Sequence, residues 1–281
     1  MNDLAVSIVS YNAAEALGRC LRHVLASDFP GSFEVVVVDN ASSDGSPDVA
    51  RRFPGVRVLE PGRNLFYTGG NNRAWQATDS RYFLILNSDC YVDADALSVS
   101  VSYLDDHPEV GAVTVRMAFE SGEEQGICAR FQDRWYSVLW YTAAGGLLPS
   151  LRARAKARVF YEGWDRSFTR PVEVAPDSFL VVRRCALPDG LYDEAMALYF
   201  TEDDLCRRLA DGDWRVDFVA DARVVHPERT STNREPPRHI RTIFFNDLRA
   251  YYRKFEPAWY AATLAGLIRL SELLRRVRGA T

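Results

Sequence analysis

The first hundred residues alternate between short apolar runs and stretches with helical periodicity. The predicted strands, rich in β-branched residues, are 5–10, 33–38, 56–59 and 82–86. The predicted helices between them are 13–26, 46–53 and, after the glycine pair Gly69-Gly70, 72–77. Continuous apolar strands that alternate with helices are typical of a mostly parallel sheet covered on both faces. We therefore predict an α/β fold with a Rossmann-like, mostly parallel sheet flanked by helices.

Polar clusters directly follow three of the predicted strands. They are Tyr11-Asn12, Asp39-Asn40 and Asn87-Ser88-Asp89. In sheets of this kind, ligands bind outside the carboxyl ends of the strands. The clusters therefore predict a ligand site at that edge of the sheet.

The second half of the chain is less regular. The predicted strands there are 112–117, 179–182, 215–219 and 222–225. A helix is predicted over 202–211, ended by Gly212, and the pattern is helical again from Pro237 onward, with an interruption at Pro257. Segment 119–170 combines aromatic residues, glycines and a basic run without a clear period. No element is predicted within it.

Charge and cysteine content narrow the function. The 281 residues carry a net charge of −4 and lack the basic stripe of a nucleic-acid-binding protein, so no nucleic-acid partner is expected. The five cysteines form no CxxC, which argues against a disulfide framework or a zinc cluster and fits a reducing cytoplasm. The longest nearly apolar run, 258–268, is about half of the roughly 20 residues that a membrane-spanning helix needs. We therefore expect a soluble, cytoplasmic protein without a secretory signal.

Asp89 is a candidate metal ligand. It ends the polar cluster after the most apolar strand and offers the oxygen ligand that Mg²⁺ or Mn²⁺ prefers. The alternative is that Asp89 only caps a turn or a nearby helix. For that role Asp93 is the better candidate, because it directly precedes the helical pattern that begins at residue 94.

Glu202, Asp203 and Asp204 open the predicted helix at 202–211. Acidic residues are common there because they complement the helix dipole. Successive helix residues point about 100° apart, so one of the three could face a cleft. His226 ends a predicted strand; a lone histidine is usually structural, but at a sheet edge that carries acids it is a candidate ligand.

Four segments occur in the order found in a known family. They read VSIVSYN at 6–12, VDNASSDGS at 38–46, NLFYTGGNN at 64–72 and NSD at 87–89. With them the chain resembles the inverting family 2 glycosyltransferases of the GT-A fold, and within that family the bacterial rhamnosyltransferase-like branch. The resemblance extends from Val6 to about Tyr252. It implies metal-dependent transfer of a sugar from a nucleotide-diphosphate donor.

The resemblance also implies roles for the matching residues. The donor would contact Ser10, Tyr11, Asn12, Asp39, Asn64, Gly70, Asn71, Asn87 and Ser88. Asp39 would hold the base of the nucleotide, and Asp89 and His226 would bind Mg²⁺ or Mn²⁺. The catalytic base would be Glu202, with Asp203 as the alternative because the literal Glu-Asp pair is Glu202-Asp203.

The chain departs from the family pattern in four places. The metal motif DxD is Asn87-Ser88-Asp89, and the first acid of the family's acidic pair is Thr201. The glycine of NxGF is Phe66, a change expected to reshape the donor pocket. The glycine–alanine that usually precedes the strand at 179–182 is Asp177-Ser178, which we place on the acceptor side.

Under this interpretation, Glu202 deprotonates an acceptor hydroxyl that displaces the diphosphate with inversion. The donor would be a dTDP-, UDP- or GDP-linked sugar, with rhamnose or another deoxyhexose favoured by the branch. The acceptor would be a glycan, a lipid-linked glycan or a small-molecule hydroxyl, as in bacterial polysaccharide biosynthesis. A nucleotidyltransferase is disfavoured because the turn at 11–14 has neither glycine nor lysine. A non-catalytic nucleotide- or sugar-binding module is supported only by Asn87 and Thr201.

We divide the chain into a GT-A domain, residues 1–235, and a helical extension, residues 236–281. The domain has a nucleotide-binding half, 1–105, and an acceptor-binding half, 106–235. In the extension, 258–281 carries an apolar segment followed by Arg269, Arg275, Arg276 and Arg278. Two interpretations stay open: contact with the inner face of the cytoplasmic membrane, or packing on the chain's own domain or on a second subunit in a homodimer.

Overall fold

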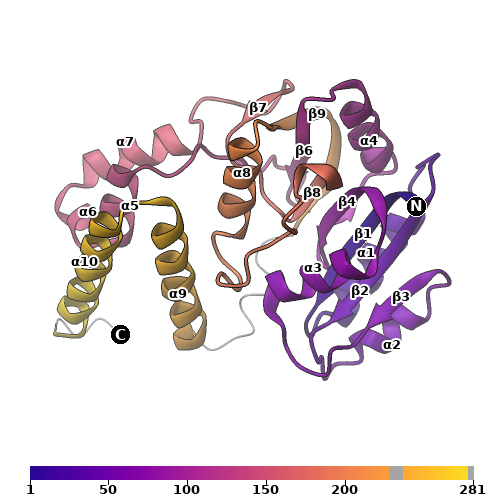
Figure 1. Cartoon of the computed structure of the whole chain (residues 1–281), viewed down its shortest axis with the longest axis horizontal. Helices are drawn as coiled ribbons and strands as arrows, with labels where there is room; N and C mark the ends of the chain where they lie inside the picture. The colour runs from indigo at the N-terminus through magenta and orange to yellow at the C-terminus, as the bar shows by residue number, and fades with distance from the viewer. Residues whose placement is uncertain (228–236, 278–281) are drawn as a thin grey trace.

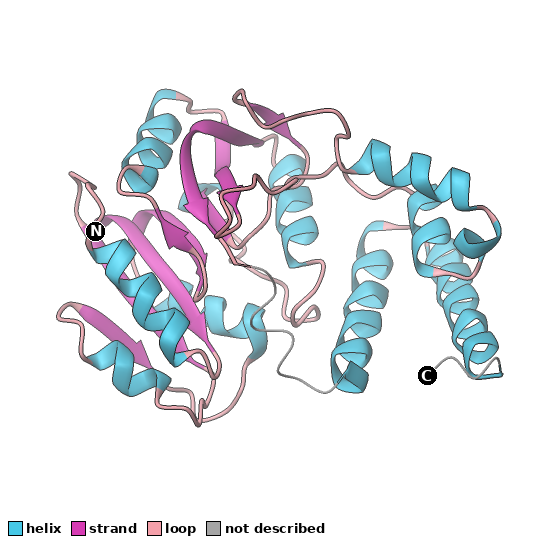
Figure 2. Ribbon diagram, turned by 180° about the vertical axis from the view of Figure 1, so that it is seen from behind, coloured by secondary structure: helices cyan, strands magenta, loops and turns pink. Residues whose placement is uncertain are grey.

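The computed structural model describes residues 1–227 and 237–277 of the chain. A single mixed sheet forms the body of the protein, with helices on both of its faces (Figure 1). A second group of helices lies beside the sheet, as the opposite view also shows (Figure 2). The predicted α/β fold is confirmed.

The sheet has nine strands in the order β3-β2-β1-β4-β8-β6-β9-β5, with β7 paired to β9. They are β1 (Asn2–Ser10), β2 (Phe33–Asp39), β3 (Val56–Leu59), β4 (Ser80–Asn87), β5 (Tyr91–Val92), β6 (Val110–Ala118), β7 (Arg170–Val172), β8 (Phe179–Arg183) and β9 (Arg215–Val225). Strands β1 to β4 run parallel, whereas β8 is antiparallel to both β4 and β6. Because β9 is parallel to β6, the ends of β1, β2, β4, β6 and β9 and the beginning of β8 all meet at one edge.

The helices lie between the strands and after the last of them. They are α1 (Ala14–Leu25), α2 (Ser46–Arg51), α3 (Phe66–Ala77), α4 (Ala96–Asp106), α5 (Arg134–Tyr141), α6 (Ala144–Leu147), α7 (Pro149–Val159), α8 (Thr201–Asp211), α9 (Pro237–Phe255) and α10 (Ala258–Val277), with a short 3-10 turn η1 (Arg184–Ala186). As predicted, α8 ends at Gly212, and α9 and α10 are separated at Pro257. Within the described residues, no helix is both long and apolar enough to cross a bilayer.

Two apolar clusters cover the two faces of the sheet. Successive side chains of a strand point to opposite faces. Val35 and Val37 of β2 therefore join the cluster that includes α1 and α4, and Val36 and Val38 join the cluster that includes α3 and α8. This two-sided burial explains why the strands are continuous apolar runs. It also fixes the edge at which the polar residues after the strands gather.

Helix α3 begins earlier than predicted. It starts at Phe66, and both glycines of the pair lie inside it, so the predicted start after Gly70 is wrong. A Cβ at Gly70 would lie only 2.8 Å from the Val9 side chain of β1. The glycine is therefore required for close packing of α3 on the sheet rather than for a break in the chain.

The predicted cap of α4 is also wrong. The residue that precedes the helix is Asp95, and its side chain makes no capping hydrogen bond. Asp93 instead forms an ion pair with Arg223 of β9, with Oδ2 and Nε 3.0 Å apart. The antiparallel pairing of β5 with β9 brings these two residues together, which local sequence does not reveal.

Segment 119–170, for which no element was predicted, contains α5, α6 and α7, and β7 begins at its last residue. Helices α5 to α7 lie with α9 and α10 in the group beside the sheet, which we call the helical lobe (Figures 1 and 2). Val138 and Tyr141 of α5 pack against the aromatic cluster around Tyr251 and Tyr252 of α9. The N–H of Ala143 donates to Ser271 Oγ of α10 at 2.7 Å. The lobe is thus assembled from two distant parts of the sequence.

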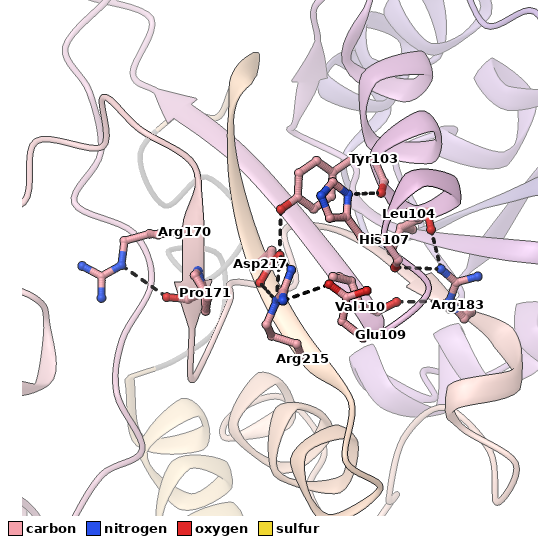
Figure 3. Close-up of polar contacts among 10 residues, drawn as sticks. All are labelled: Tyr103, Leu104, His107, Glu109, Val110, Arg170, Pro171, Arg183, Arg215 and Asp217. Atoms are coloured by element: carbon pink, nitrogen blue, oxygen red, sulfur yellow. Dashed lines mark hydrogen bonds and ion pairs between the residues drawn. The ribbon is translucent and has the colours of Figure 1, made fainter.

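The two strands predicted at 215–219 and 222–225 form one strand, β9, whose register with β6 shifts between Val115 and Arg116. The start of β9 contains an ion pair whose carboxylate is buried. Asp217, which is fully buried, accepts from Arg215 Nη2 at 2.7 Å and from the Tyr103 hydroxyl at 2.8 Å (Figure 3). Buried charges are tolerated when paired and hydrogen-bonded in this way. The Tyr103 hydroxyl, which comes from α4, ties this start to the fold, and the other end of β9 leads to His226.

Candidate active site

A cavity of about 480 Å³ lies at the sheet edge where β1, β2 and β4 end. Its lining comes from four places. The ends of the strands contribute Val9, Tyr11, Asn40, Asn87 and Ser88, and the start of α3 contributes Asn64, Phe66 and Tyr67. The segments before β8 and α8 contribute Asp177 and Leu198, and α9 contributes His239, Ile240 and Ile243. A ligand in this cavity would touch both the sheet and the helical lobe.

Five residues predicted for the site line this cavity: Tyr11, Asn64, Asn87, Ser88 and Asp177. Three of them follow β1 and β4, so the strand-end argument locates them correctly. Asn64 also shapes the backbone, because its Oδ1 accepts the N–H of Phe66 at 2.7 Å. Phe66 has a φ of 57°, the left-handed region that favours glycine, which is the residue of the family pattern there.

Asp39 and Ser10 face each other across β1 and β2. Asp39 is buried, and its Oδ2 accepts the N–H of Ser42 at 2.9 Å. Within the described residues, the other carboxylate oxygen of Asp39 and the Ser10 hydroxyl are buried without a hydrogen-bond partner. Buried polar atoms of this kind are costly unless a ligand supplies the partner. The pair is therefore equipped to accept and donate hydrogen bonds to a polar ligand.

Three other residues that were predicted to bind the donor instead make contacts with other parts of the protein. Asn71 is buried, accepts from the Ser7 hydroxyl at 2.7 Å and donates to the Tyr67 carbonyl at 3.0 Å. Gly70 packs on β1, as described above. Asn12 has a φ of 50°, and its Oδ1 accepts a backbone N–H of the β2–α2 loop at 2.8 Å. These residues do not line the cavity, although they determine its shape.

Asp89 and His226 lie side by side at the same edge. Asp89 follows β4, His226 follows β9, and His226 Nε2 is 3.4 Å from Asp89 Oδ1. A carboxylate with an imidazole suits Mn²⁺, and such cations often take few protein ligands and complete their shell with phosphates and water. Across residues 1–227 and 237–277, no group of three or more His, Cys, Asp or Glu side chains is arranged to hold a metal. The pair therefore fits a divalent cation that a phosphorylated ligand helps to bind.

Carboxyl groups gather where the chain enters β8 and α8, and one of them, Asp177, lines the cavity. Asp177 Oδ2 accepts from the Tyr192 hydroxyl at 2.7 Å and from Thr201 Oγ1 at 2.8 Å. Thr201 Oγ1 also lies 3.1 Å from Glu202 Oε2. A hydroxyl has a single proton, so Thr201 can donate to one carboxyl group and accept from the other when that one is protonated. The cluster is thus arranged to hold a proton near Glu202.

The surroundings of Glu202 tune its proton affinity. Burial, and then the charges of Asp177 and Asp203, raise the pKa of Glu202 to about 8. Burial likewise raises the pKa of Asp177. Neighbouring carboxyl groups in a buried site do not readily all ionise together. A carboxyl group with a pKa near the working pH is well suited to act as a general base.

Asp203, the alternative base, points toward the helical lobe. Burial raises the pKa of Asp203 to about 7. Its charge adds to burial in raising the pKa of Tyr141 and Tyr251, which belong to the aromatic cluster of the lobe. The charge of Glu202 acts instead on Tyr67, which lines the cavity. The charge of Glu202 thus acts on the cavity and that of Asp203 on the lobe, which makes Glu202 the better candidate for the base.

Ser178 is the second residue placed on the acceptor side from sequence. Its hydroxyl contacts Met117 Sδ at 3.4 Å, and its carbonyl accepts the N–H of Asn87 at 2.9 Å. Ser178 therefore positions the end of β4 rather than lining the cavity. Sequence reasoning missed Tyr192 and His239, since neither lies in a motif and only the folding of α9 over the strand ends brings His239 to the site.

The chain is similar to known sugar transferases. The family model of glycosyl transferase family 2 matches residues 5–149, just over half of the chain. The N-acetylglucosaminyl-diphospho-decaprenol L-rhamnosyltransferase of Mycobacterium tuberculosis is 27% identical over 300 residues, which cover 97% of this chain and 91% of that protein.

Solved structures show the same fold at lower identity. The mannosyltransferase PcManGT from Pyrobaculum calidifontis, in complex with GDP-Man and Mn²⁺, is 19% identical with a TM-score of 0.56, over 97% of this chain and 75% of that one. Staphylococcus aureus TarS is 16% identical with a TM-score of 0.56, over 90% of this chain and 44% of that one. The chain thus spans less than half of TarS. The GT-A fold predicted from the motifs is confirmed.

Proposed function

Because the chain belongs to glycosyl transferase family 2, we propose that it transfers a sugar from a nucleoside-diphosphate donor to an acceptor hydroxyl with inversion at the anomeric carbon. One observation carries the proposal: Glu202, whose pKa is about 8, belongs to the carboxyl cluster that Asp177 joins to the cavity. A base beside donor-binding groups is what a single displacement needs.

In the proposed reaction, the Glu202 carboxylate accepts the proton of the acceptor hydroxyl. The hydroxyl oxygen forms its bond to the anomeric carbon on the face opposite the diphosphate. The bond between that carbon and the diphosphate oxygen breaks, and the nucleoside diphosphate leaves with the electron pair. Asp177 and Thr201 keep the Glu202 carboxyl within its buried cluster, so that it can exchange a proton near neutral pH.

The nucleoside is proposed to lie over the ends of β1 and β2. There, the free oxygen of Asp39 and the hydroxyl of Ser10 would bond to the base. Asn87 would contact the ribose, and Tyr11 and Asn64 would border the rest of the donor. All of these positions lie within or next to the 480 Å³ cavity.

Asp89 and His226 are proposed to hold Mg²⁺ or Mn²⁺. When bound, the cation neutralises the charge that develops on the leaving diphosphate. The support is the approach of the two side chains and the Mn²⁺ in the solved structure of PcManGT.

We further propose a deoxyhexose such as rhamnose as the transferred sugar, linked to dTDP, UDP or GDP. The name of the mycobacterial relative describes transfer of L-rhamnose to a lipid-diphosphate-linked sugar. The apolar side chains of Phe66, Leu198 and Ile243 line part of the cavity. Apolar walls suit a sugar with a methyl group in place of a hydroxymethyl, because a buried hydroxyl without a partner is costly. A lipid-linked glycan is the proposed acceptor, in bacterial polysaccharide biosynthesis.

The helical lobe is proposed to rest on an anionic membrane surface, at the inner face of the cytoplasmic membrane. Segment 134–160 contains five basic residues and no acidic one, whereas the whole chain carries a net charge of −4. Leu147 is 80% exposed, and Leu270 and Leu273 of α10 are also exposed. Apolar side chains beside basic ones fit such a surface.

Part of the sequence-based argument for this contact rested on Arg275, Arg276 and Arg278. Their side chains lie outside the described residues, so the proposal depends on the lobe alone. A second subunit packed on the same face is the competing explanation, which the vesicle experiment below separates. The boundary between residues 1–235 and 236–281 also stays a proposal. Since α9 lines the cavity, the extension would be part of the site.

Turnover with a panel of dTDP-, UDP- and GDP-linked sugars tests the function, with a polyprenyl-diphosphate-linked N-acetylglucosamine as acceptor. We expect one donor class to be used, a product of inverted anomeric configuration by NMR, and loss of activity with chelator and in Asp89→Ala. Nucleotide binding without turnover would favour the non-catalytic module. Absence of both would overturn the proposal.

A further inference from the structure

The loop that leads into α8 is anchored by a buried carboxylate of α9. Asp247 is only 2% exposed, and its Oδ2 accepts the backbone N–H groups of Leu198 and Tyr199, both at 2.9 Å. Hydrogen bonds to an ionised carboxylate are short and strong. Leu198 lines the cavity, and Glu202 follows three residues after Tyr199. The anchor therefore acts on the stretch that joins the cavity wall to the base.

Phe200, between this anchor and Glu202, has a strained backbone. Its φ of 60° and ψ of 13° lie in the left-handed region, which a bulky side chain rarely adopts. Its ring stacks on Tyr251 of α9, with 5.3 Å between centroids, and its carbonyl accepts the N–H of Asp204 at 2.9 Å. Strained backbone near functional groups persists only where the surroundings hold it. This turn sets the direction in which α8 leaves the loop.

Lys254 of α9 and Tyr67 of α3 make further contacts with the same loop. Lys254 of α9 places its Nζ 2.9 Å from Asp193 Oδ2 and 2.6 Å from Asp204 Oδ1. On the donor side, the carbonyl of Ala197 accepts the N–H of Tyr67, at the start of α3, at 3.1 Å. The loop thus bridges α3 and α9, and two charged side chains of α9, Asp247 and Lys254, hold its α9 end.

We propose that Asp247 is a positioning residue that fixes residues 198–200 so that Glu202 stays in the carboxyl cluster of the cavity. It lies outside the segment matched by the family model, and it reaches the site only through the loop. The role of Glu202 as the base rests on the proposed function. The contact between Asp247 and the loop can be tested independently of that function. Without Asp247, the two N–H groups would form hydrogen bonds to water, and the Phe200 backbone would leave its left-handed conformation. Glu202 would then become more exposed.

The test compares Asp247→Ala with Asp247→Asn, which keeps an acceptor oxygen without the charge. Thr242→Ala is the control, because Thr242 is exposed on the same helix and its hydroxyl donates to the Arg238 carbonyl of that helix. In Asp247→Ala we expect faster amide exchange at Leu198 and Tyr199, a kcat lower by about 10- to 100-fold, and nucleotide affinity within about twofold of wild type. Asp247→Asn should recover most of kcat.

The pH profile separates positioning from a general loss of structure. Exposure of Glu202 would lower its pKa toward the ordinary range, so the acid limb of kcat/KM should move to lower pH in Asp247→Ala. An unchanged limb and kcat, despite faster exchange at the two amides, would overturn the proposal. So would an equal rise in exchange across α8 and α9. If wild type transfers no sugar, the proposed function fails, and the exchange data with an NMR titration of Glu202 still decide the anchor.

Discussion

The two walls of the cavity are held in place by different means. Tyr11, Asn40 and Asn87 follow or end parallel strands, and the backbone ladders of β1, β2 and β4 set their positions. Glu202 follows an irregular loop whose placement depends on side chains of α9, Asp247 among them. Backbone ladders survive single substitutions, whereas a side-chain anchor is lost with one residue. Donor binding should therefore be robust to distant changes, and catalysis should be sensitive to them.

The largest effect is expected on the base side. Glu202→Gln should lower kcat by about 10²- to 10⁴-fold while leaving nucleotide affinity nearly unchanged, because the amide keeps the shape but accepts no proton. Steady-state kinetics with calorimetric binding measures both. Asp203→Asn is the matched control and should lose far less, because Asp203 faces the lobe. A greater loss in Asp203→Asn would reverse the assignment of the base.

On the donor side, we expect a loss of nucleotide affinity rather than of kcat. Asp39→Ala should weaken nucleotide binding by about 10- to 100-fold, the usual worth of a hydrogen bond to a charged group, with little change in kcat at saturating donor. Titration calorimetry with the preferred nucleoside diphosphate would show this. Asp48→Ala, an exposed aspartate on α2, is the control and should bind normally. Equal affinity of the two variants would remove Asp39 from the donor site.

A stability effect should follow from the partly buried carboxyl group of Glu202. The pKa of Glu202 is raised from 4.5 to about 8 in the folded protein, so the folded state retains a proton that the unfolded chain releases. The contribution of this group to the free energy of unfolding is fully present below about pH 4.5. It is lost as the pH rises through about 8, which lowers the free energy of unfolding by on the order of 1–3 kcal/mol. Denaturant unfolding across this range measures the slope. Glu202→Gln should flatten it, and an equally steep slope in that variant would contradict the assignment.

The smallest effect concerns the lobe. The double variant Leu270→Asn, Leu273→Asn should reduce co-sedimentation with anionic vesicles several-fold, because both side chains are exposed on α10. Leu25→Asn, at an exposed leucine of α1, is the control. Size-exclusion chromatography of the same variants checks the competing homodimer. A change in oligomeric state with unaltered vesicle binding would replace the membrane by a second subunit.

Much of the fold could be predicted because it depends on the local pattern of apolar and polar residues. The strands at 5–10, 33–38 and 82–86 are apolar runs that only a doubly covered sheet can bury, and polar residues follow them at one edge. Asp89 and His226, to which the family resemblance assigns one cation, also lie side by side, although they are 137 positions apart in the sequence. The start of α3 could not be predicted, because glycines that permit close packing look the same as glycines that break a helix.

By itself, the sequence determined the α/β class, the family and the edge of the sheet where the site lies, because these depend on periodicity and on short motifs. Only the tertiary structure decided that α5 to α7 join α9 and α10 in one lobe and that α9 lines the cavity. It alone gives Glu202 and Asp203 different neighbours, since their surroundings come from distant parts of the chain. Adjacent carboxyl groups are chemically alike in sequence, and burial and neighbouring charges make them differ.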